Sequence, residues 1–247
     1  MIKVICAKDY EKVSDVAFGV IKPFLGKASV LGLATGSSPI GLYKRMIEDH
    51  KTNGTSYKDV YTFNLDEYVG LPVDHPESYY TFMKEQLFDH IDIPLENIHM
   101  PNGSGDVKAN AKAYDEAMSK KKVDMQVLGI GSNGHIGFNE PGTSFDASTH
   151  IADLTEQTRK DNARFFDPRG EEVPKQAITM GLANIMAAKN VLLIATGTKK
   201  GKAIHDMLKG PIEVTCPASI LQRHASVTVV IDEAAASLLD ESDYIRE

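Results

Sequence analysis

The stretch "ASVLGLATGSSPIGLYKRMIEDHK", residues 28–51, contains the unit from which the predicted fold is built. Its first seven residues form an apolar run with the length of a strand that is buried on both faces. Residues 38–51 have the apolar spacing of an amphipathic helix, and the small polar residues and proline before them suit a tight turn into that helix. The stretch therefore predicts a strand, a turn and a helix in succession, as in a parallel α/β sheet.

Five further apolar runs have strand length and alternate with helical patterns. The runs are residues 3–7, 60–64, 123–130, 190–196 and 226–231, and the helical patterns are residues 9–25, 78–91, 107–121 and 201–210. This alternation favours a doubly wound α/β sheet with right-handed crossovers, and we expect residues 1–247 to form a single domain. Residues 143–174 are polar and weakly periodic, which is typical of a functional lid or a surface excursion.

Composition excludes several classes of protein. The 27 Lys and Arg residues against 34 Asp and Glu residues give a net charge of −7, and no basic stripe is present, so we expect no nucleic-acid partner. No long apolar segment is present, which predicts a cytoplasmic protein without membrane contact. Cys6 and Cys216 lack metal-binding spacing, which favours buried free thiols. We expect neither a metal nor a cofactor.

Unusual polar residues follow four of the predicted strands. In an open parallel sheet, ligands bind beyond the carboxyl ends of the strands. The segments that follow apolar runs in this way are "TGSSP" (35–39), "LDEY" (65–68), "GSNGHIGFNE" (131–140) and "GTKKGK" (197–202). Four such loops at one edge of a sheet predict a binding site there.

Two of these loops, together with a nearby arginine, suit a phosphate or a carboxylate. The first is the turn of Thr35, Gly36, Ser37 and Ser38, whose hydroxyls and helix-start amides attract an anion; the ordinary alternative is a helix cap by Ser38. Lys200 is one of three lysines at the start of another helix, where cations are unfavourable unless an anion binds. Arg164 offers a planar donor for phosphate, with a solvated salt bridge as the alternative.

The strand end at Asp66 and Glu67 supplies a candidate base. Adjacent side chains of a strand face opposite sides, so at most one of these carboxylates points into the cleft. A carboxylate whose pKa is raised by burial can remove a proton next to a carbonyl. A structural role for Asp66 as a loop cap is an equal alternative on this evidence.

The glycine-rich loop displays His135 for chemistry. Gly131 and Gly134 permit unusual backbone angles and a close approach of a ligand. Glu140 can fold back to bond one imidazole nitrogen and leave the other free, while Asn133 orients the pair. With the anion loops and Asp66, this arrangement fits a sugar phosphate, held at one end while acid–base groups act at the other.

Six consecutive motifs resemble the glucosamine-6-phosphate deaminase family over almost the whole chain. They are "LGLATGSSPIGLY", "FNLDEYVGL", "HPESYYTFM", "GIGSNGHIGFNEPG", "LTEQTRKDNARFF" and "VPKQAITMG". The resemblance implies a Rossmann-like three-layer sandwich with a mostly parallel central sheet. It also implies an enzyme of amino sugar catabolism that converts glucosamine 6-phosphate and water to fructose 6-phosphate and ammonia.

The same resemblance implies a role for each matching residue. Asp66 would move a proton between C2 and C1 through an enolic intermediate, and His135 would open the sugar ring with the help of Glu140 and Asn133. The phosphate would lie on residues 35–38, Arg164 and Lys200, and residues from about 155 to 177 would form a mobile lid.

Two positions depart from the family pattern. Many bacterial relatives carry Asp where this chain has Asn133; an amide can hold the imidazole but cannot stabilise its protonated form by charge, so we expect a different pH dependence of ring opening. Allosteric hexameric relatives bind the activator N-acetylglucosamine 6-phosphate with an arginine at the position of His150 and a longer C-terminal tail. We therefore expect no such activation, and a monomer or small homo-oligomer.

Two other functions share parts of these patterns. A 6-phosphogluconolactonase has a related fold and phosphate site, but it needs attack by water on a lactone, and the pair "NLDEYVGL" and "GHIGFNEPG" favours the deaminase. A non-catalytic sugar-phosphate sensor would bring a basic DNA-binding segment, for which this chain shows no candidate.

Overall fold

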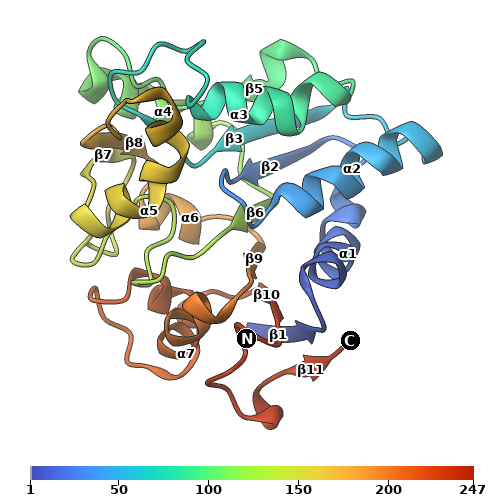
Figure 1. Cartoon of the computed structure of the whole chain (residues 1–247). Coiled ribbons are helices and arrows are strands. Elements are labelled where there is room, and N and C mark those ends of the chain that lie inside the picture. The colour runs from blue at the N-terminus through green and yellow to red at the C-terminus, as the bar shows by residue number, and fades with distance from the viewer. Residues whose placement is uncertain (1) are drawn as a thin grey trace.

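The structure is a computed structural model that describes residues 2–247. An eight-stranded sheet forms its centre (Figure 1). The strand order is β11-β1-β10-β9-β6-β2-β3-β5, and every neighbouring pair is parallel. The strands are β1 (Ile2–Ala7), β2 (Ser29–Leu33), β3 (Val60–Asn64), β5 (Ile98–His99), β6 (Met125–Leu128), β9 (Val191–Ala195), β10 (Val227–Asp232) and β11 (Ile245–Arg246). All six predicted strands are confirmed; the two that the sequence did not indicate, β5 and β11, are too short to show a pattern.

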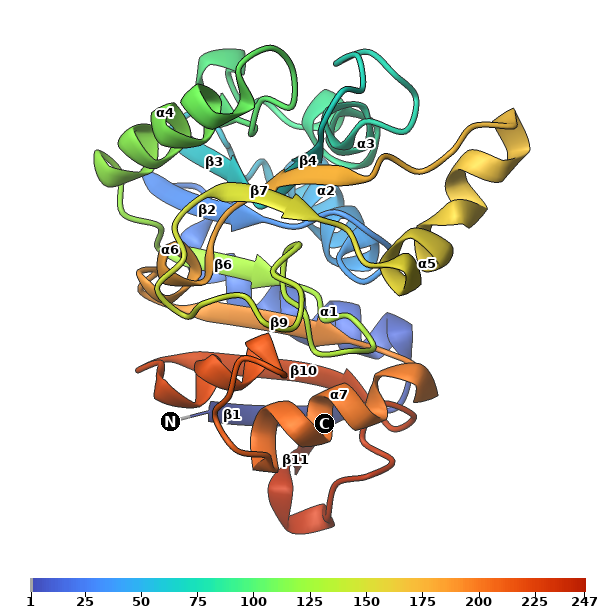
Figure 2. The ribbon, with the colours of Figure 1, turned by 90° about the vertical axis from the view of Figure 1, so that its left-hand side faces the viewer.

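Helices cover both faces of this sheet, which confirms the predicted three layers (Figures 1 and 2). On one face lie α1 (Tyr10–Ile21) and α2 (Ile40–Asn53), with α3 (Tyr79–Gln86) against α2. On the other lie α4 (Val107–Ser119), α6 (Leu182–Met186) and α7 (Gly201–Lys209). Short 3₁₀ helices connect them: η1 (Lys22–Phe24), η2 (Phe88–His90), η3 (Leu95–Asn97), η4 (Asp167–Arg169), η5 (Thr198–Lys200), η6 (Pro217–Arg223) and η7 (Glu241–Asp243).

A second, three-stranded antiparallel sheet was not predicted. It has the order β4-β8-β7 and consists of β4 (Asp66–Tyr68), β8 (Gln176–Thr179) and β7 (His150–Asp153). Each strand has only three or four residues, so its side-chain alternation is too short to distinguish it from a loop. The consequence for the site is that Asp66 begins a strand, with Thr179 of β8 as its partner in the register.

The polar region that follows the glycine-rich loop contains a helix, α5 (Glu156–Phe166), between β7 and β8. Its hydrophobic signal in the sequence is weak because it contains only three apolar residues, and only Thr158 and Phe166 on it are buried. Figure 2 shows α5 beyond the carboxyl ends of the parallel strands. The segment expected to form a lid, about 155–177, thus comprises α5, the return that follows it and the first two residues of β8.

Two clusters of buried apolar residues hold these layers together. The larger lies between the parallel sheet and its helices, and the smaller lies under α5 and includes Tyr68, Phe138 and Phe166. Cys6 is buried, but Cys216 is only partly buried, so the expectation of two buried thiols is wrong for Cys216; both thiols are free. Within residues 2–247, no helix is long and apolar enough to span a membrane.

Candidate functional site

A cavity of about 920 Å³ opens at the carboxyl ends of β2, β3, β6 and β9. All of the predicted site residues line it except Asn133 and Glu140, which lie behind His135. The lining includes Thr35, Gly36, Ser37, Ser38, Asp66, His135, Arg164 and Lys200. The strand ends that the sequence singled out therefore meet in one cavity, as the parallel sheet predicts.

The turn of residues 35–38 presents free donors to this cavity. Gly36 has φ +87°, a left-handed conformation that favours glycine, and it bends the chain from β2 towards α2. The helix begins at Ile40 and no side chain caps its first turn, so the alternative of a cap by Ser38 is wrong. The turn is supported from behind by Tyr10, whose hydroxyl accepts from Gly41 N (2.7 Å) and donates to Ser37 O (2.9 Å).

Two cations on separate elements line the same cavity. Lys200 precedes α7, and its Nζ donates to Ile130 O at 2.6 Å. Burial lowers the pKa of Lys200, with Arg164 and Lys199 acting in the same direction and Asp161 opposing them. Because these cations repel one another, a bound anion would relieve the repulsion. Lys202, by contrast, pairs with an aspartate on its own helix at the surface, so it is not part of the site.

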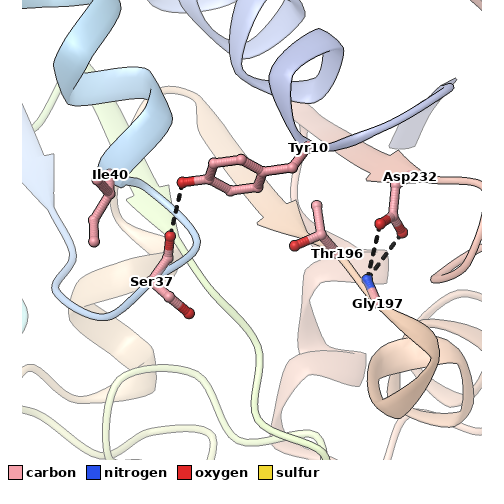
Figure 3. A pocket seen from close by; sticks show the side chains of 6 residues that line it. All are labelled: Tyr10, Ser37, Ile40, Thr196, Gly197 and Asp232. Carbon is pink, nitrogen blue, oxygen red and sulfur yellow. Dashed lines mark hydrogen bonds between the residues drawn. The ribbon is translucent and has the colours of Figure 1, made fainter.

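A smaller cavity of about 490 Å³ lies beside the turn of residues 35–38 and the loop that begins at residue 196 (Figure 3). Its lining contains Tyr10 and Ser37 from one side and Gly197 and Asp232 from the other. Both carboxylate oxygens of Asp232 accept from Gly197 N at 3.0 Å, and one also accepts from Ala235 N at 2.7 Å. Asp232 therefore fixes the loop that leads to Lys200.

Sequence reasoning missed Tyr10 and Asp232. Asp232 is the last residue of β10, and a carboxylate at the end of a buried strand was a signal that could have found it. Tyr10 gave no such signal, since it lies at the start of α1 and acts through the backbone of a distant turn.

Asp66 and Glu67 face opposite sides of β4, as expected. Asp66 lines the cavity and is only 6% exposed, and burial together with the charge of Glu67 raises its pKa to about 8. The carboxylate of Glu67 accepts from three backbone amides, those of Tyr68 (2.8 Å), Tyr79 (3.0 Å) and Tyr80 (3.0 Å). Glu67 thus stabilises the first turn of α3. Of the two carboxyl groups, that of Asp66 lines the cavity and can contact a ligand.

Two glycines shape the loop that carries His135. Gly134 has φ +84°, which confirms the expected unusual backbone. Gly131 does not have a positive φ; instead it leaves space for the imidazole, since a Cβ there would lie 2.3 Å from His135 Cε1. The expectation of an unusual backbone at Gly131 is therefore wrong, and this glycine is needed because the ring packs directly on the chain.

His135, Glu140 and Asn133 form the expected cluster, with one difference in detail. His135 Nδ1 lies 3.5 Å from Glu140 Oε2, so Nε2 is the imidazole nitrogen left for a ligand. Asn133 Nδ2 donates to Glu140 Oε2 at 2.9 Å, and Asn133 Oδ1 accepts from His135 N at 3.2 Å. The Asn133 amide thus holds the Glu140 carboxylate and the backbone of His135. It was expected to hold the imidazole ring, and it does not.

The second oxygen of Glu140 is held by two threonines that sequence reasoning missed. Thr158 Oγ1 donates to Glu140 Oε1, and Thr155 Oγ1 lies 3.3 Å from the same oxygen. Burial would raise the pKa of Glu140, but His135, Thr158 and Asn133 outweigh it and lower this pKa to about 2. Glu140 is therefore a carboxylate at neutral pH, whereas the nearby Asp66 keeps its proton up to a much higher pH.

The site thus has two ends with different chemistry. The turn of residues 35–38, Arg164 and Lys200 offer donors and positive charge to an anion. Asp66 and the His135–Glu140 pair offer a base and an acid–base group in the same cavity. No three His, Cys, Asp or Glu side chains of residues 2–247 are arranged to hold a metal ion.

Comparison with known proteins gives consistent results. The family model described as glucosamine-6-phosphate isomerases and 6-phosphogluconolactonase matches residues 25–230. A glucosamine-6-phosphate deaminase of Geobacillus sp. (strain WCH70) is 49% identical over 243 residues, which are 97% of this chain and 96% of that protein. One of Streptococcus thermophilus (strain ATCC BAA-491 / LMD-9) is 50% identical over 239 residues, or 96% of this chain and 100% of that protein.

Solved structures extend the comparison to the fold. A protein described as a monomeric glucosamine-6-phosphate deaminase superimposes with a TM-score of 0.91 at 44% identity, covering 96% of this chain and 99% of its own. The 6-phosphogluconolactonase of Trypanosoma brucei superimposes with a TM-score of 0.77 at 19% identity, covering 97% of this chain and 99% of its own. At that identity the second likeness concerns the fold alone.

Proposed function

The chain belongs to the family of glucosamine-6-phosphate isomerases and 6-phosphogluconolactonases, and from this membership we propose that it is an enzyme that deaminates glucosamine 6-phosphate. The products of this reaction, which consumes one water, are fructose 6-phosphate and ammonia. The observation that carries the proposal is that one cavity contains both an anion site and, separate from it, a buried carboxyl and a histidine–glutamate pair. Relatives near 50% identity are deaminases, which favours this reaction over lactone hydrolysis.

We propose that the phosphate ester binds to the turn of residues 35–38, Arg164 and Lys200. The hydroxyls of this turn are not used to cap α2, and the two cations lower the cost of burying a dianion. Holding the phosphate at this end directs the sugar ring towards Asp66 and His135.

Ring opening is the proposed task of His135. It requires removal of the proton from the hydroxyl at C1 and donation of a proton to the ring oxygen, so one acid–base group can serve both steps. Nδ1 faces a carboxylate that stays charged, which fixes the ring and supports an imidazolium, while Nε2 is left for the substrate. Asn133 and Glu140 act through the histidine.

Proton transfer between carbons is the proposed task of Asp66. As a carboxylate it takes the proton from C2 of the open-chain aldehyde, while the ammonium group at C2 gives a proton to the C1 oxygen, so that a neutral enol with an amino group at C2 forms. Asp66 then returns its proton to C1. The nitrogen at C2 is then an iminium, which water hydrolyses to the ketone with loss of ammonia. Burial makes this carboxylate a strong base, and a cationic amino group of the substrate favours its ionisation.

The direct test is the release of ammonia from glucosamine 6-phosphate by wild type, Asp66→Asn and His135→Gln. Wild type should release ammonia, and each variant should lose at least about 100-fold in kcat, the usual contribution of one acid–base group. Hydrolysis of 6-phosphogluconolactone without ammonia release would overturn the proposed reaction. Retention of most activity by both variants would overturn the assignment of these two residues.

Further properties follow from the proposed reaction. We propose that residues 1–247 act as one catalytic domain and as a monomer or small homo-oligomer, and that the segment of about 155–177 closes over the bound sugar. A cytoplasmic location fits a charged metabolite, since a sugar phosphate does not cross a bilayer unaided.

A further inference from the structure

The first turn of α5 touches the acid–base pair directly. Thr158 is 4% exposed, and its Oγ1 donates to Glu140 Oε1. The other oxygen of Glu140 faces His135 and Asn133. Thr158 therefore anchors one carboxylate oxygen while the other meets the imidazole.

A purely structural role in the helix cap does not account for this hydroxyl. The cap of α5 is the side chain of Thr155, which accepts from the backbone N–H of Thr158. That bond uses the Thr158 amide and not its hydroxyl. The Thr158 hydroxyl accepts from the hydroxyl of Thr155 at 3.0 Å, so its own proton is available for the bond to Glu140. Removing it leaves the backbone part of the cap intact.

Loss of the Thr158 hydroxyl would change how tightly the His135–Glu140 pair holds the proton that the two side chains share. His135 is the titratable group that acts on the Glu140 carboxyl, and the remaining partners, Asn133 and Thr155, are neutral. Without Thr158, one oxygen of a buried carboxylate would lose its main donor, which makes the carboxylate more basic and strengthens its attraction for an imidazolium.

We infer that Thr158 is a positioning residue for the His135–Glu140 pair. Its hydroxyl fixes the orientation of the Glu140 carboxylate and thereby the oxygen that faces Nδ1 of the imidazole. The importance of this contact for ring opening rests on the proposed function, but the contact and its effect on titration do not. Because Arg164 is on the same helix, α5 carries a group for each end of the substrate.

The test is an NMR titration of the imidazole of His135, whose signal is identified by its loss in His135→Gln. In Thr158→Val, which has nearly the same shape but lacks the hydroxyl, the midpoint of the titration should move to higher pH by about one unit. Thr158→Ser, which restores the hydroxyl, should titrate within about 0.3 units of wild type, well inside the shift expected for Thr158→Val.

The chain supplies a matched control in Thr81. It occupies the same position in α3 as Thr158 in α5, three residues after the capping residue, and its hydroxyl contacts that residue at 3.0 Å, as Thr158 does. The Thr81 hydroxyl meets the carbonyl of Val73, however, and not a carboxylate. Thr81→Val should therefore leave the midpoint of His135 unchanged.

Kinetics give a second measurement. If the chain deaminates glucosamine 6-phosphate, Thr158→Val should lower kcat about tenfold while the inhibition constant of inorganic phosphate changes less than about twofold, because Arg164 and Lys200 are untouched. Thr158→Ser should recover most of the kcat.

Two outcomes would overturn the inference. A wild-type midpoint in Thr158→Val would mean that the threonine serves packing only. An equal shift in Thr158→Val and Thr158→Ser would assign the effect to side-chain volume and not to the hydroxyl. If wild type releases no ammonia, the proposed function fails, but the titration still decides the role of Thr158.

Discussion

The substitution Asp66→Asn is expected to stabilise the protein while it abolishes activity. Asp66 is 6% exposed, and its pKa is raised from 3.8 to about 8 by burial and by the charge of Glu67. Between about pH 4 and pH 8 the unfolded chain has lost this proton while the native state keeps it. The free energy of unfolding therefore falls as the pH rises through this interval.

The magnitude follows from the size of the shift. Each unit corresponds to about 1.4 kcal/mol, so a shift of about four units costs up to about 6 kcal/mol once the pH exceeds 8. At pH 7 most of this cost, about 4 kcal/mol, is already present. An asparagine has no proton to lose, so its free energy of unfolding should lack this dependence on pH.

Urea denaturation of wild type and Asp66→Asn from pH 4.5 to pH 8.5 measures the effect. The difference in free energy of unfolding should grow with pH in favour of the variant, by about 1.4 kcal/mol per unit, while ammonia release falls at least about 100-fold. Asp59→Asn, at an exposed aspartate, is the control and should run parallel to wild type. If Asp66→Asn also runs parallel to wild type, Asp66 does not titrate as a buried carboxyl and the reasoning fails.

Further expectations follow from other contacts of the site. Asn133→Asp should lower the free energy of unfolding at pH 7 by about 1–3 kcal/mol, because it puts a second carboxylate where an amide donates to Glu140; urea denaturation should show the loss disappearing towards pH 4, as the pair gains a proton. Lys200→Met should raise KM for glucosamine 6-phosphate about 10- to 100-fold with little change in kcat. The surface substitution Lys202→Met should leave both KM and kcat unchanged. Asp232→Asn should raise KM severalfold in steady-state assays, because it loosens the loop before Lys200, and an unchanged KM would refute its positioning role. N-acetylglucosamine 6-phosphate should leave the rate curve unchanged; a sigmoidal curve that it makes hyperbolic would contradict the expectation of no activation.

The central sheet was predictable because its strands carry a strong local signal. Runs such as residues 28–34 and 190–196 are mostly apolar, as strands buried on both faces are, and the loops that follow them meet at one edge by topology alone. The shared cavity of Asp66, His135 and Lys200 follows from this arrangement.

The parts that were not predictable depend on contacts between distant segments. The sheet of β4, β8 and β7 joins short strands that are far apart in the chain, and α5 contains only three apolar residues, Ala163, Phe165 and Phe166. The hydroxyls of Thr158 and Tyr10 are ordinary polar groups until the fold brings them to Glu140 and to the carbonyl of Ser37. Local pattern carries no information on such pairs.

The roles proposed for Thr158 and Arg164 would constrain the length of α5 between them. Thr158 and Arg164 are six residues apart, which corresponds to about 9 Å along the helix axis. Inserting or deleting a single residue between them would rotate one side chain by about 100° relative to the other. The two side chains could then not both keep their present positions in the site. Point substitutions on the exposed face of α5 should be freely exchanged among descendants of this chain, whereas changes in the count of residues between these two positions should be absent from functional ones.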